Sequence, residues 1–342
     1  MVKVLHVCSG KGPGGTRTVF LAHQKLFSKL EVIATPVLRR KAAIKSNLTK
    51  EAIERVEEID YYRRFPIKMQ PVYKKMAKLA CNNDIIWVHK PIDAYIWRQV
   101  SPNSKIVLVV HGFQNTNLKE ADYLVAVSVP VLEHLERKGL KNAFLVNNFL
   151  PESGRSKEIT WNKKIQISSF GFFRRKKGFT DLIKAIDILK NEFFCSNFNV
   201  DIYGNGRLGF VLRLMKHLKK LANLRINDWT NDVFSCLSKT DVVVIPSRSE
   251  SFSMVTIEAM LSGCLVVATK CRGPEYIISN NVNGILVEKS NPKQMALKLQ
   301  CIISDPQNFT NIRKNAIKMV IEKFSISNSI DAMKIVLQMA LG

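Results

Sequence analysis

The chain has 342 residues, of which 46% are hydrophobic, and a formal net charge of +24 at pH 7. This length favours two domains with separate cores, and the apolar fraction excludes a disordered chain. No apolar run reaches the roughly 18 to 20 residues of a membrane-spanning helix, and the N-terminus MVKVLHVCSG leads into a strand rather than a signal peptide. The seven cysteines lack zinc-ligand spacing. We therefore expect a cytoplasmic protein without a bound metal.

The first predicted domain covers residues 1–150. Apolar runs at residues 2–8, 85–88, 106–110 and 123–128 alternate with helical stretches, which predicts a doubly wound parallel sheet. After the first run, glycines including Gly14 and Gly15 precede a helix and would let the backbone approach a phosphate or an acceptor. The loop matches neither GxGxxG nor a P-loop, and a tight turn without a ligand is equally compatible with it.

His111 follows the strand at 106–110, at the sheet edge where ligands gather in such folds. A histidine there can hydrogen-bond a ligand hydroxyl or carbonyl. The sequence predicts no functional role for the other five histidines.

Two basic segments of this domain, residues 39–50 and 63–78, are candidate contact surfaces. In the second segment apolar residues alternate with cations: Phe65, Ile67, Met69, Val72 and Tyr73. Exposed apolar residues mixed with basic ones suit the headgroup region of an anionic bilayer. Residues 39–78 are therefore predicted to contact an anionic membrane surface, although a solvated basic loop explains the pattern equally well.

The second predicted domain covers residues 151–325, after a polar linker at 146–164. Its predicted elements are strands at 165–170, 199–203, 241–245 and 264–269 and helices at 180–190, 211–221 and 254–261. This alternation predicts a second Rossmann-like domain. Residues 292–342 are helical in pattern, and the last helix, 326–342, is a candidate to cross back to the first domain.

Two carboxylates flank the predicted helix start at residue 254. Glu250 lies in the preceding loop, and Glu258 lies about a turn and a half inside the helix. A helix N-terminus attracts anions through its free N–H groups and its dipole. A diphosphate fits there, with a carboxylate on either side to accept hydrogen bonds from hydroxyl-rich groups.

A basic loop and a glycine turn are predicted at the same sheet edge. The loop follows the strand at 165–170 and contains four consecutive cations, residues 174–177, which would neutralise a diphosphate leaving group. A solvated surface remains an alternative for two of the four. Gly204 and Gly206 follow the strand at 199–203 and are compatible with backbone contact to a nucleotide base.

Taken together, residues 165–287 resemble the retaining glycosyltransferases of family four, which have the two-domain GT-B fold. The residues that carry the resemblance are Lys177-Gly178, Gly204-Asn205-Gly206, Pro246-Ser247, Glu250 and Glu258 at the E-x7-E spacing, Ala259, Gly263, Gly273-Pro274-Glu275 and Asn283-Gly284. Their order and spacing are specific, whereas any one of them alone is not. In the first domain the glycine loop and His111-Gly112 match.

The resemblance implies transfer of a sugar, with retention and without a required metal, from a UDP- or GDP-linked donor to an acceptor hydroxyl. In this reading Glu250 holds the hydroxyls of the donor sugar and Glu258 those of the ribose. Lys177, with Arg174 or Arg175, holds the diphosphate and stabilises its charge as the bond breaks.

The resemblance also assigns backbone N–H groups of Ser253, Met254 and Val255 to the anion site. His111 and the Gly14-Gly15 loop would face the sugar and the acceptor. Phe172 stands where the family usually has an arginine, so Arg174 or Arg175 is expected to hold the diphosphate in its place.

Further departures from the family pattern are Ser253, where a glycine is usual, Leu265, where a proline is usual, and Arg272, which replaces a glycine. Ser253 retains a hydroxyl that can cap a helix.

The acceptor that the resemblance implies is a lipid-linked saccharide in lipopolysaccharide or capsule polysaccharide synthesis. The protein itself is then expected to be peripheral to the inner face of the membrane. One alternative is a GT-B protein that binds sugar nucleotides for another reaction, such as epimerisation. A nucleic-acid-binding protein is the other alternative. It is disfavoured because the charge is spread along the chain and no recognition motif is present.

Overall fold

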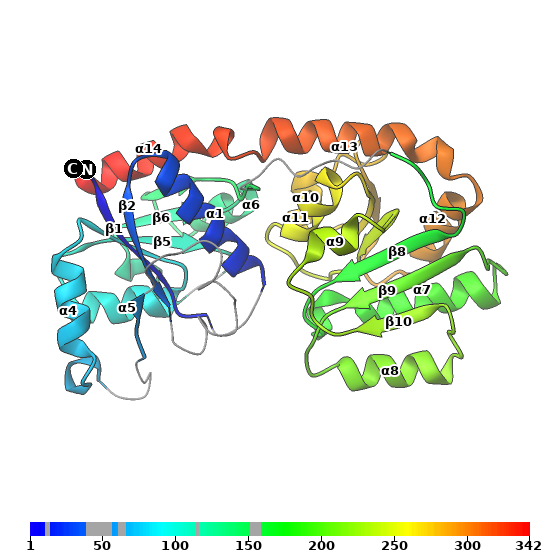
Figure 1. The fold of residues 1–342 in the computed structure, drawn as a ribbon, viewed down its shortest axis with the longest axis horizontal. Coiled ribbons are helices and arrows are strands. Elements are labelled where there is room, and N and C mark those ends of the chain that lie inside the picture. Colours follow the sequence, from blue (N-terminus) through cyan, green and yellow to red (C-terminus); the bar gives the residue numbers. More distant parts are fainter. Residues whose placement is uncertain (11–13, 39–56, 61–65, 114–115, 151–158) are drawn as a thin grey trace. The chain divides into compact units, whose positions relative to one another are not determined.

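The computed structural model describes residues 1–10, 14–38, 57–60, 66–113, 116–150 and 159–342. The chain divides into two compact units (Figure 1): Met1–Pro151 with Ser325–Gly342, and Glu152–Phe324. Each unit contains a parallel sheet with helices around it. The prediction of two Rossmann-like domains is confirmed.

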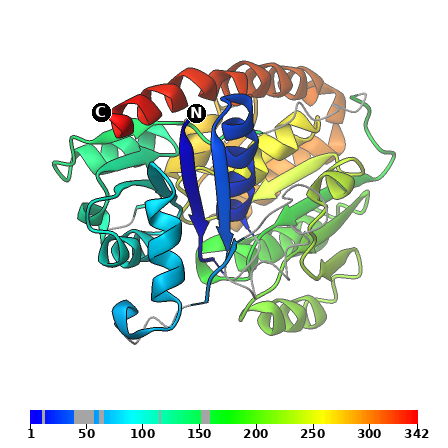
Figure 2. The same cartoon turned by 60° about the vertical axis from the view of Figure 1, so that its left-hand side comes forward.

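The sheet of the first unit has the strand order β3-β2-β1-β4-β5-β6-β7 in the described part of the chain, with every pairing parallel. The strands are β1 (Lys3–Cys8), β2 (Ile33–Leu38), β3 (Glu57–Glu58), β4 (Ile85–Val88), β5 (Lys105–Val110), β6 (Tyr123–Ala126) and β7 (Ala143–Leu145). The helices are α1 (Gly15–Lys29), α4 (Tyr73–Cys81), α5 (Pro91–Val100), α6 (Val129–Glu136) and α14 (Ser327–Leu341). Figure 2 shows α1 beside β1 and β2.

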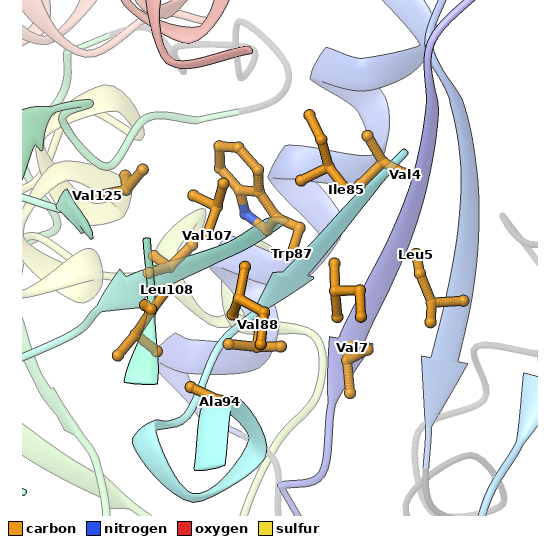
Figure 3. Packing of buried hydrophobic residues seen from close by; sticks show 14 of the residues in the cluster. Val4, Leu5, Val7, Ile85, Trp87, Val88, Ala94, Val107, Leu108 and Val125 are labelled. Carbon is orange, nitrogen blue, oxygen red and sulfur yellow. The ribbon is translucent and has the colours of Figure 1, made fainter. Parts of the chain in front are cut away.

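The central strands of this sheet are buried on both faces, which explains their continuous apolar runs. Figure 3 shows Val7, Val88 and Val107 from neighbouring strands in one cluster with Ala94 of α5. Helix α14 adds Met333 to the same core, although it follows the whole second unit in the sequence. The first unit is therefore built from two separate stretches of chain.

The sheet of the second unit has the strand order β10-β9-β8-β11-β12-β13 among the described residues, again parallel throughout. The strands are β8 (Ile165–Phe170), β9 (Phe198–Tyr203), β10 (Leu224–Asn227), β11 (Val242–Ile245), β12 (Leu265–Thr269) and β13 (Ile285–Val287). The helices are α7 (Phe179–Asn191), α8 (Gly209–Leu218), α9 (Val233–Leu237), α10 (Met254–Leu261), α11 (Arg272–Ile277), α12 (Pro292–Ser304) and α13 (Thr310–Lys323).

The helix predicted at 211–221 begins and ends earlier in the structure, as α8 (Gly209–Leu218). Lys220 adopts a left-handed conformation with φ 49°. The Lys220 amide donates to the His217 carbonyl, and the Leu221 amide donates to the Lys216 carbonyl. These two bonds form a Schellman closure, which ends the helix and returns Leu221 to the core. The prediction missed this end because lysine is an unusual residue at such a cap.

The predicted membrane segment is described in part. Residues 39–56 and 61–65 lie outside the described residues. In the remainder, Ile67 and Met76 are buried, and Val72 and Tyr73 pack partly against the first core, whereas Met69 is exposed. Ile67 and Met76 therefore serve the fold, and Val72 and Tyr73 contribute to its packing while staying partly exposed. In the part of the chain that is described, no helix has both the length and the apolar character needed to cross a bilayer.

Candidate functional site

The loop between β11 and α10 is tied to the loop that precedes α7. The Arg248 guanidinium donates to both carboxylate oxygens of Asp181 over 2.8–3.1 Å, and the Arg248 amide donates to the Lys176 carbonyl over 2.8 Å. The Asp181 side chain is 7% exposed, and a bidentate pair of this kind fixes direction as well as distance. The two loops are therefore held as one surface. Neither Arg248, in the loop, nor Asp181, in the first turn of α7, was singled out from the sequence, because a lone charged residue gives no sign of its partner.

The tied loops bring Lys177 to Glu250. Lys177 Nζ forms a short ion pair with Glu250 Oε1, and the Ser247 hydroxyl donates to the same oxygen over 2.9 Å. The side chains are 22% and 14% exposed, so solvent screens the pair only in part. Two residues chosen separately from the sequence, 73 positions apart, are thus in contact.

Glu258 lies within α10 and is buried, with 6% of its surface exposed. Among the described residues no hydrogen-bond donor reaches its carboxyl group. Burial raises the pKa of Glu258 to about 7 because a carboxylate loses hydration in an apolar setting. Within the described part of the chain, Glu258 is thus a buried acid without a hydrogen-bond partner for its carboxyl group.

Ser253 precedes α10 in a left-handed conformation, with φ 97°. Its hydroxyl accepts from the Thr256 hydroxyl over 2.8 Å, and it makes no capping bond to a helix amide. The predicted capping role of the Ser253 side chain is wrong. At positive φ the residue takes the backbone conformation that glycine adopts most easily, which accounts for the usual family glycine here. The first amides of the helix, those of Met254 and Val255, have no acceptor within the helix.

Of the basic loop after β8, Arg174 and Arg175 are exposed and Lys177 is half-buried. The Arg174 guanidinium lies 5.1 Å from the centre of the Phe172 ring, which stacks on Trp229 at 4.7 Å. With Lys176, which is also exposed, the loop therefore presents three cations to solvent and turns Lys177 toward Glu250.

The glycines after β9 are required by close backbone packing. A Cβ on Gly204 would lie 2.0 Å from the Gly171 carbonyl oxygen, and one on Gly206 would lie 2.8 Å from the Phe173 oxygen. The Phe173 amide also donates to the Asn205 carbonyl over 2.7 Å. Close approach between the β8 and β9 loops thus explains Gly204 and Gly206 whether or not a nucleotide is bound.

Gly178, the residue after Lys177, gives a test of this loop packing. It has φ +67°, and a Cβ there would lie 1.8 Å from the Pro246 carbonyl oxygen. We expect Gly178→Ala to lower the melting temperature by clearly more than Gly139→Ala, since Gly139 has a similar φ of +73° with no atom within 4 Å of its Cβ position. The control variant Gly139→Ala should lose about 1–2 kcal/mol of unfolding free energy, because alanine is strained at a positive φ. Equal losses in thermal unfolding would contradict the close contact.

In the first unit, a chain of buried histidines leads to His111. His6 Nδ1 lies 2.6 Å from Gln24 Oε1, and His6 Nε2 lies 2.7 Å from His89 Nε2. His89 Nδ1 in turn lies 2.9 Å from His111 Nε2. Burial lowers the pKa of His6 and of His111 to about 3, so both rings are neutral at pH 7. With the Gln24 oxygen accepting, each neutral ring has one proton to donate, and His111 donates from Nε2.

This histidine chain was missed from the sequence, although His89 directly follows β4 at the same sheet edge as His111. Of the described residues, His6, His23 and His89 could offer a metal ion ligand atoms within 4.8 Å of one another. The 2.7 Å contact between His6 and His89 is a hydrogen-bond distance. It is shorter than the roughly 3.3 Å between two ligands of a tetrahedral zinc ion with bonds of about 2.0–2.1 Å.

Residues 153–319 match the family described as glycosyl transferases group 1. This range contains the Lys177–Glu250 pair, Glu258 and the Arg248–Asp181 pair. The match thus covers nearly all of the second unit, which is similar to group 1 glycosyltransferases. His111, Gly14 and Gly15 lie outside the matched range, in the first unit.

Curated relatives of the chain are also named glycosyltransferases. It is 29% identical over 211 residues to an uncharacterized glycosyltransferase of Methanocaldococcus jannaschii, covering 60% of this chain and 56% of the relative. It is 26% identical over 167 residues to the lipopolysaccharide core biosynthesis glycosyltransferase LpsE of Rhizobium meliloti, covering 48% and 47%. The matches thus span about half the length of these relatives.

The likeness to solved structures extends beyond residues 153–319. The crystal structure of Anabaena HepE in complex with UDP and glucose superimposes with a TM-score of 0.83 at 19% identity, covering 99% of this chain and 100% of that one. Because the likeness spans both units, the GT-B architecture expected from the sequence is confirmed.

Proposed function

We propose that the protein is a retaining glycosyltransferase that moves a sugar from a nucleotide diphosphate sugar to an acceptor hydroxyl. The observation that carries the proposal is the Lys177–Glu250 pair, held beside the start of α10 by the Arg248–Asp181 bridge. This arrangement places a cation, a carboxylate and a helix N-terminus on one pair of loops. It suits a diphosphate that carries a hydroxyl-rich sugar.

Departure of the nucleoside diphosphate develops negative charge on the leaving oxygen. Lys177, with Arg174 or Arg175 and the amides of α10, would stabilise that charge as the bond breaks. Glu250 would accept hydrogen bonds from the sugar hydroxyls and keep Lys177 in position before the donor binds. The departing phosphate itself would take the acceptor proton, so no side-chain base is required.

Glu258 would hold the ribose of the donor. Its carboxyl group has no donor among the described residues, and two ribose hydroxyls would supply the missing hydrogen bonds. The backbone of the Gly204–Gly206 turn would lie against the base, and no metal ion would be needed to hold the diphosphate.

The acceptor we propose is a lipid-linked saccharide used in cell-surface polysaccharide or lipopolysaccharide synthesis. The name of the Rhizobium meliloti relative supports this substrate class. The protein would then act at the inner face of a membrane, through the basic residues 39–78 of the first unit. His111 and the Gly14-Gly15 loop would serve the sugar and the acceptor.

Nucleotide binding tests the proposal directly. A ligand bound by the folded state at about 100 times its Kd adds about 2.7 kcal/mol to stability, so we expect UDP or GDP to raise the melting temperature of the full chain by several degrees. UDP, GDP, ADP and duplex DNA should be compared at equal concentration. A shift with DNA alone would contradict the proposed donor site. Turnover of a sugar nucleotide to its epimer, without transfer, would favour the alternative reaction.

A further inference from the structure

Helix α8 presents an unusual stripe of apolar side chains to solvent. Phe210 is 75% exposed, Leu214 44% and Leu218 70%. Their spacing of four residues places them along one side of the helix, and Val211, which is 39% exposed, widens the stripe. The opposite side carries Leu212, which is fully buried and joins α8 to the core of the second unit. The exposed side chains of the stripe are thus not required for the packing of the domain.

A row of cations runs beside the stripe. Arg213 and Lys216 lie three residues apart on another side of α8, and Lys220 follows the end of the helix at Leu218. The segment 207–220, RLGFVLRLMKHLKK, contains five lysines and arginines and no aspartate or glutamate. Asp228 is the described acid that pairs with Arg213, at 3.5 Å, and it is almost fully exposed. Arg213 and Lys220 are exposed and Lys216 is half-buried, so this segment presents cations as well as apolar side chains to water.

Figure 1 shows α8 along the rim of the second unit, with the sheet of that unit on one side of it. Within that unit α8 contacts α7 and β10. Phe210, Leu214 and Leu218 remain exposed despite these contacts, so the stripe is left for a partner outside the unit.

The combination of cations and exposed apolar side chains on this surface favours one class of partner over others. A second copy docked through the same face would bring two rows of cations together, which opposes the contact. Nucleic acid would pair with the cations, but Phe210 is the one ring of the stripe on which a base could stack, and the leucines and Val211 would stay in water. An anionic bilayer satisfies both parts, because lipid phosphates pair with cations at the level of the headgroups while apolar side chains enter the acyl boundary.

We propose that α8 is a membrane-surface helix that docks the second unit on an anionic bilayer. Phe210, Leu214 and Leu218 enter the acyl boundary, and Arg213, Lys216 and Lys220 pair with lipid phosphates. This surface is separate from residues 39–78 of the first unit. It does not depend on the proposed sugar transfer, so failure of either proposal leaves the other standing.

Vesicle sedimentation of the full chain tests the proposal. Vesicles of equal parts phosphatidylglycerol and phosphatidylcholine should bind the protein, and pure phosphatidylcholine should bind it at least about tenfold less, given roughly 1 kcal/mol for each basic residue at an anionic surface. Changing Phe210, Leu214 and Leu218 together to serine should reduce partition to the mixed vesicles by about tenfold or more. A melting curve checks that this variant remains folded.

A matched control changes three exposed apolar residues of other helices, Leu297, Ile321 and Ile335, to serine, which should leave partition within about twofold of the parent. Reversing the cations, as R213E with K216E and K220E, should abolish the preference for anionic vesicles. Unchanged binding by the serine variant of α8 would overturn the proposal. A dimer in light scattering that this variant dissociates, without vesicle binding by the parent, would likewise overturn it in favour of a second copy.

Discussion

Glu250→Gln is expected to lower sugar transfer by about a hundredfold or more while changing the affinity for the free nucleotide little. The substitution keeps the shape of the side chain but removes the charge that pairs with Lys177 and accepts hydrogen bonds from the sugar. Preorganised charges at a reacting centre contribute on the order of 10²–10³ in rate, because they act in a partly desolvated setting. Single-turnover transfer and nucleotide titration, measured on the same preparation, separate the two effects.

The chain offers a matched control for Glu250. Glu288 pairs with Lys270 in a second lysine–glutamate contact, but both side chains are about half exposed. Exposed pairs of this kind contribute little to stability, so Glu288→Gln should leave both transfer and binding near the parent values. If Glu250→Gln and Glu288→Gln behave alike, Glu250 does not belong to the site.

Glu258→Gln is expected to weaken nucleotide binding and, at alkaline pH, to stabilise the protein. The pKa of Glu258 is raised from 4.5 to about 7 by burial. Below pH 4.5 the carboxyl is protonated in both the folded and the unfolded chain, so it has no effect on the free energy of unfolding. Between pH 4.5 and 7 the unfolded chain loses its proton first, so stability falls as the pH rises. Above pH 7 the full cost, about 3 kcal/mol, is present.

Glutamine removes this cost because it does not ionise. Denaturant unfolding at pH 5 and at pH 8 should therefore show a small difference between Glu258→Gln and the parent at pH 5 and a clear gain for the variant at pH 8. Nucleotide titration at pH 8 should show weaker binding by the same variant, since an amide is a poorer acceptor for ribose hydroxyls than a carboxylate. A variant that is less stable than the parent at pH 8 would mean that the carboxylate has a partner in the folded protein.

The central strands of each unit could be predicted from the sequence, because buried parallel strands appear as short apolar runs between helices. The outer strands β2, β3, β7, β10 and β13 were missed. The runs at 85–88 and 165–170 match β4 and β8 residue for residue. The helix end at Leu218 was missed, since it depends on a left-handed lysine that no composition rule favours. Local patterning thus located the elements and was weakest where an unusual residue ends one.

The candidate site was predictable where its residues follow strand ends. Lys177 and Glu250 were chosen for that reason, and the structure brings them into contact. Their support by Arg248 and Asp181 could not be predicted, because the bond joins residues 67 positions apart and depends on side-chain direction. The histidine chain was hidden for a related reason: His6 lies in the middle of a strand, where a polar residue shows its purpose only once its neighbours are known.

The first unit is built from two separate stretches of chain, and this affects the order of folding. During synthesis, residues 152–324 are complete before α14 exists, yet α14 packs on β5, β6 and β7 of the unit made first. Those strands must leave the ribosome with part of their apolar surface bare, and domains generally fold as units once their sequence is available. The second unit should therefore finish folding before the first, so a chaperone that protects the nascent chain would have most to cover on the N-terminal sheet.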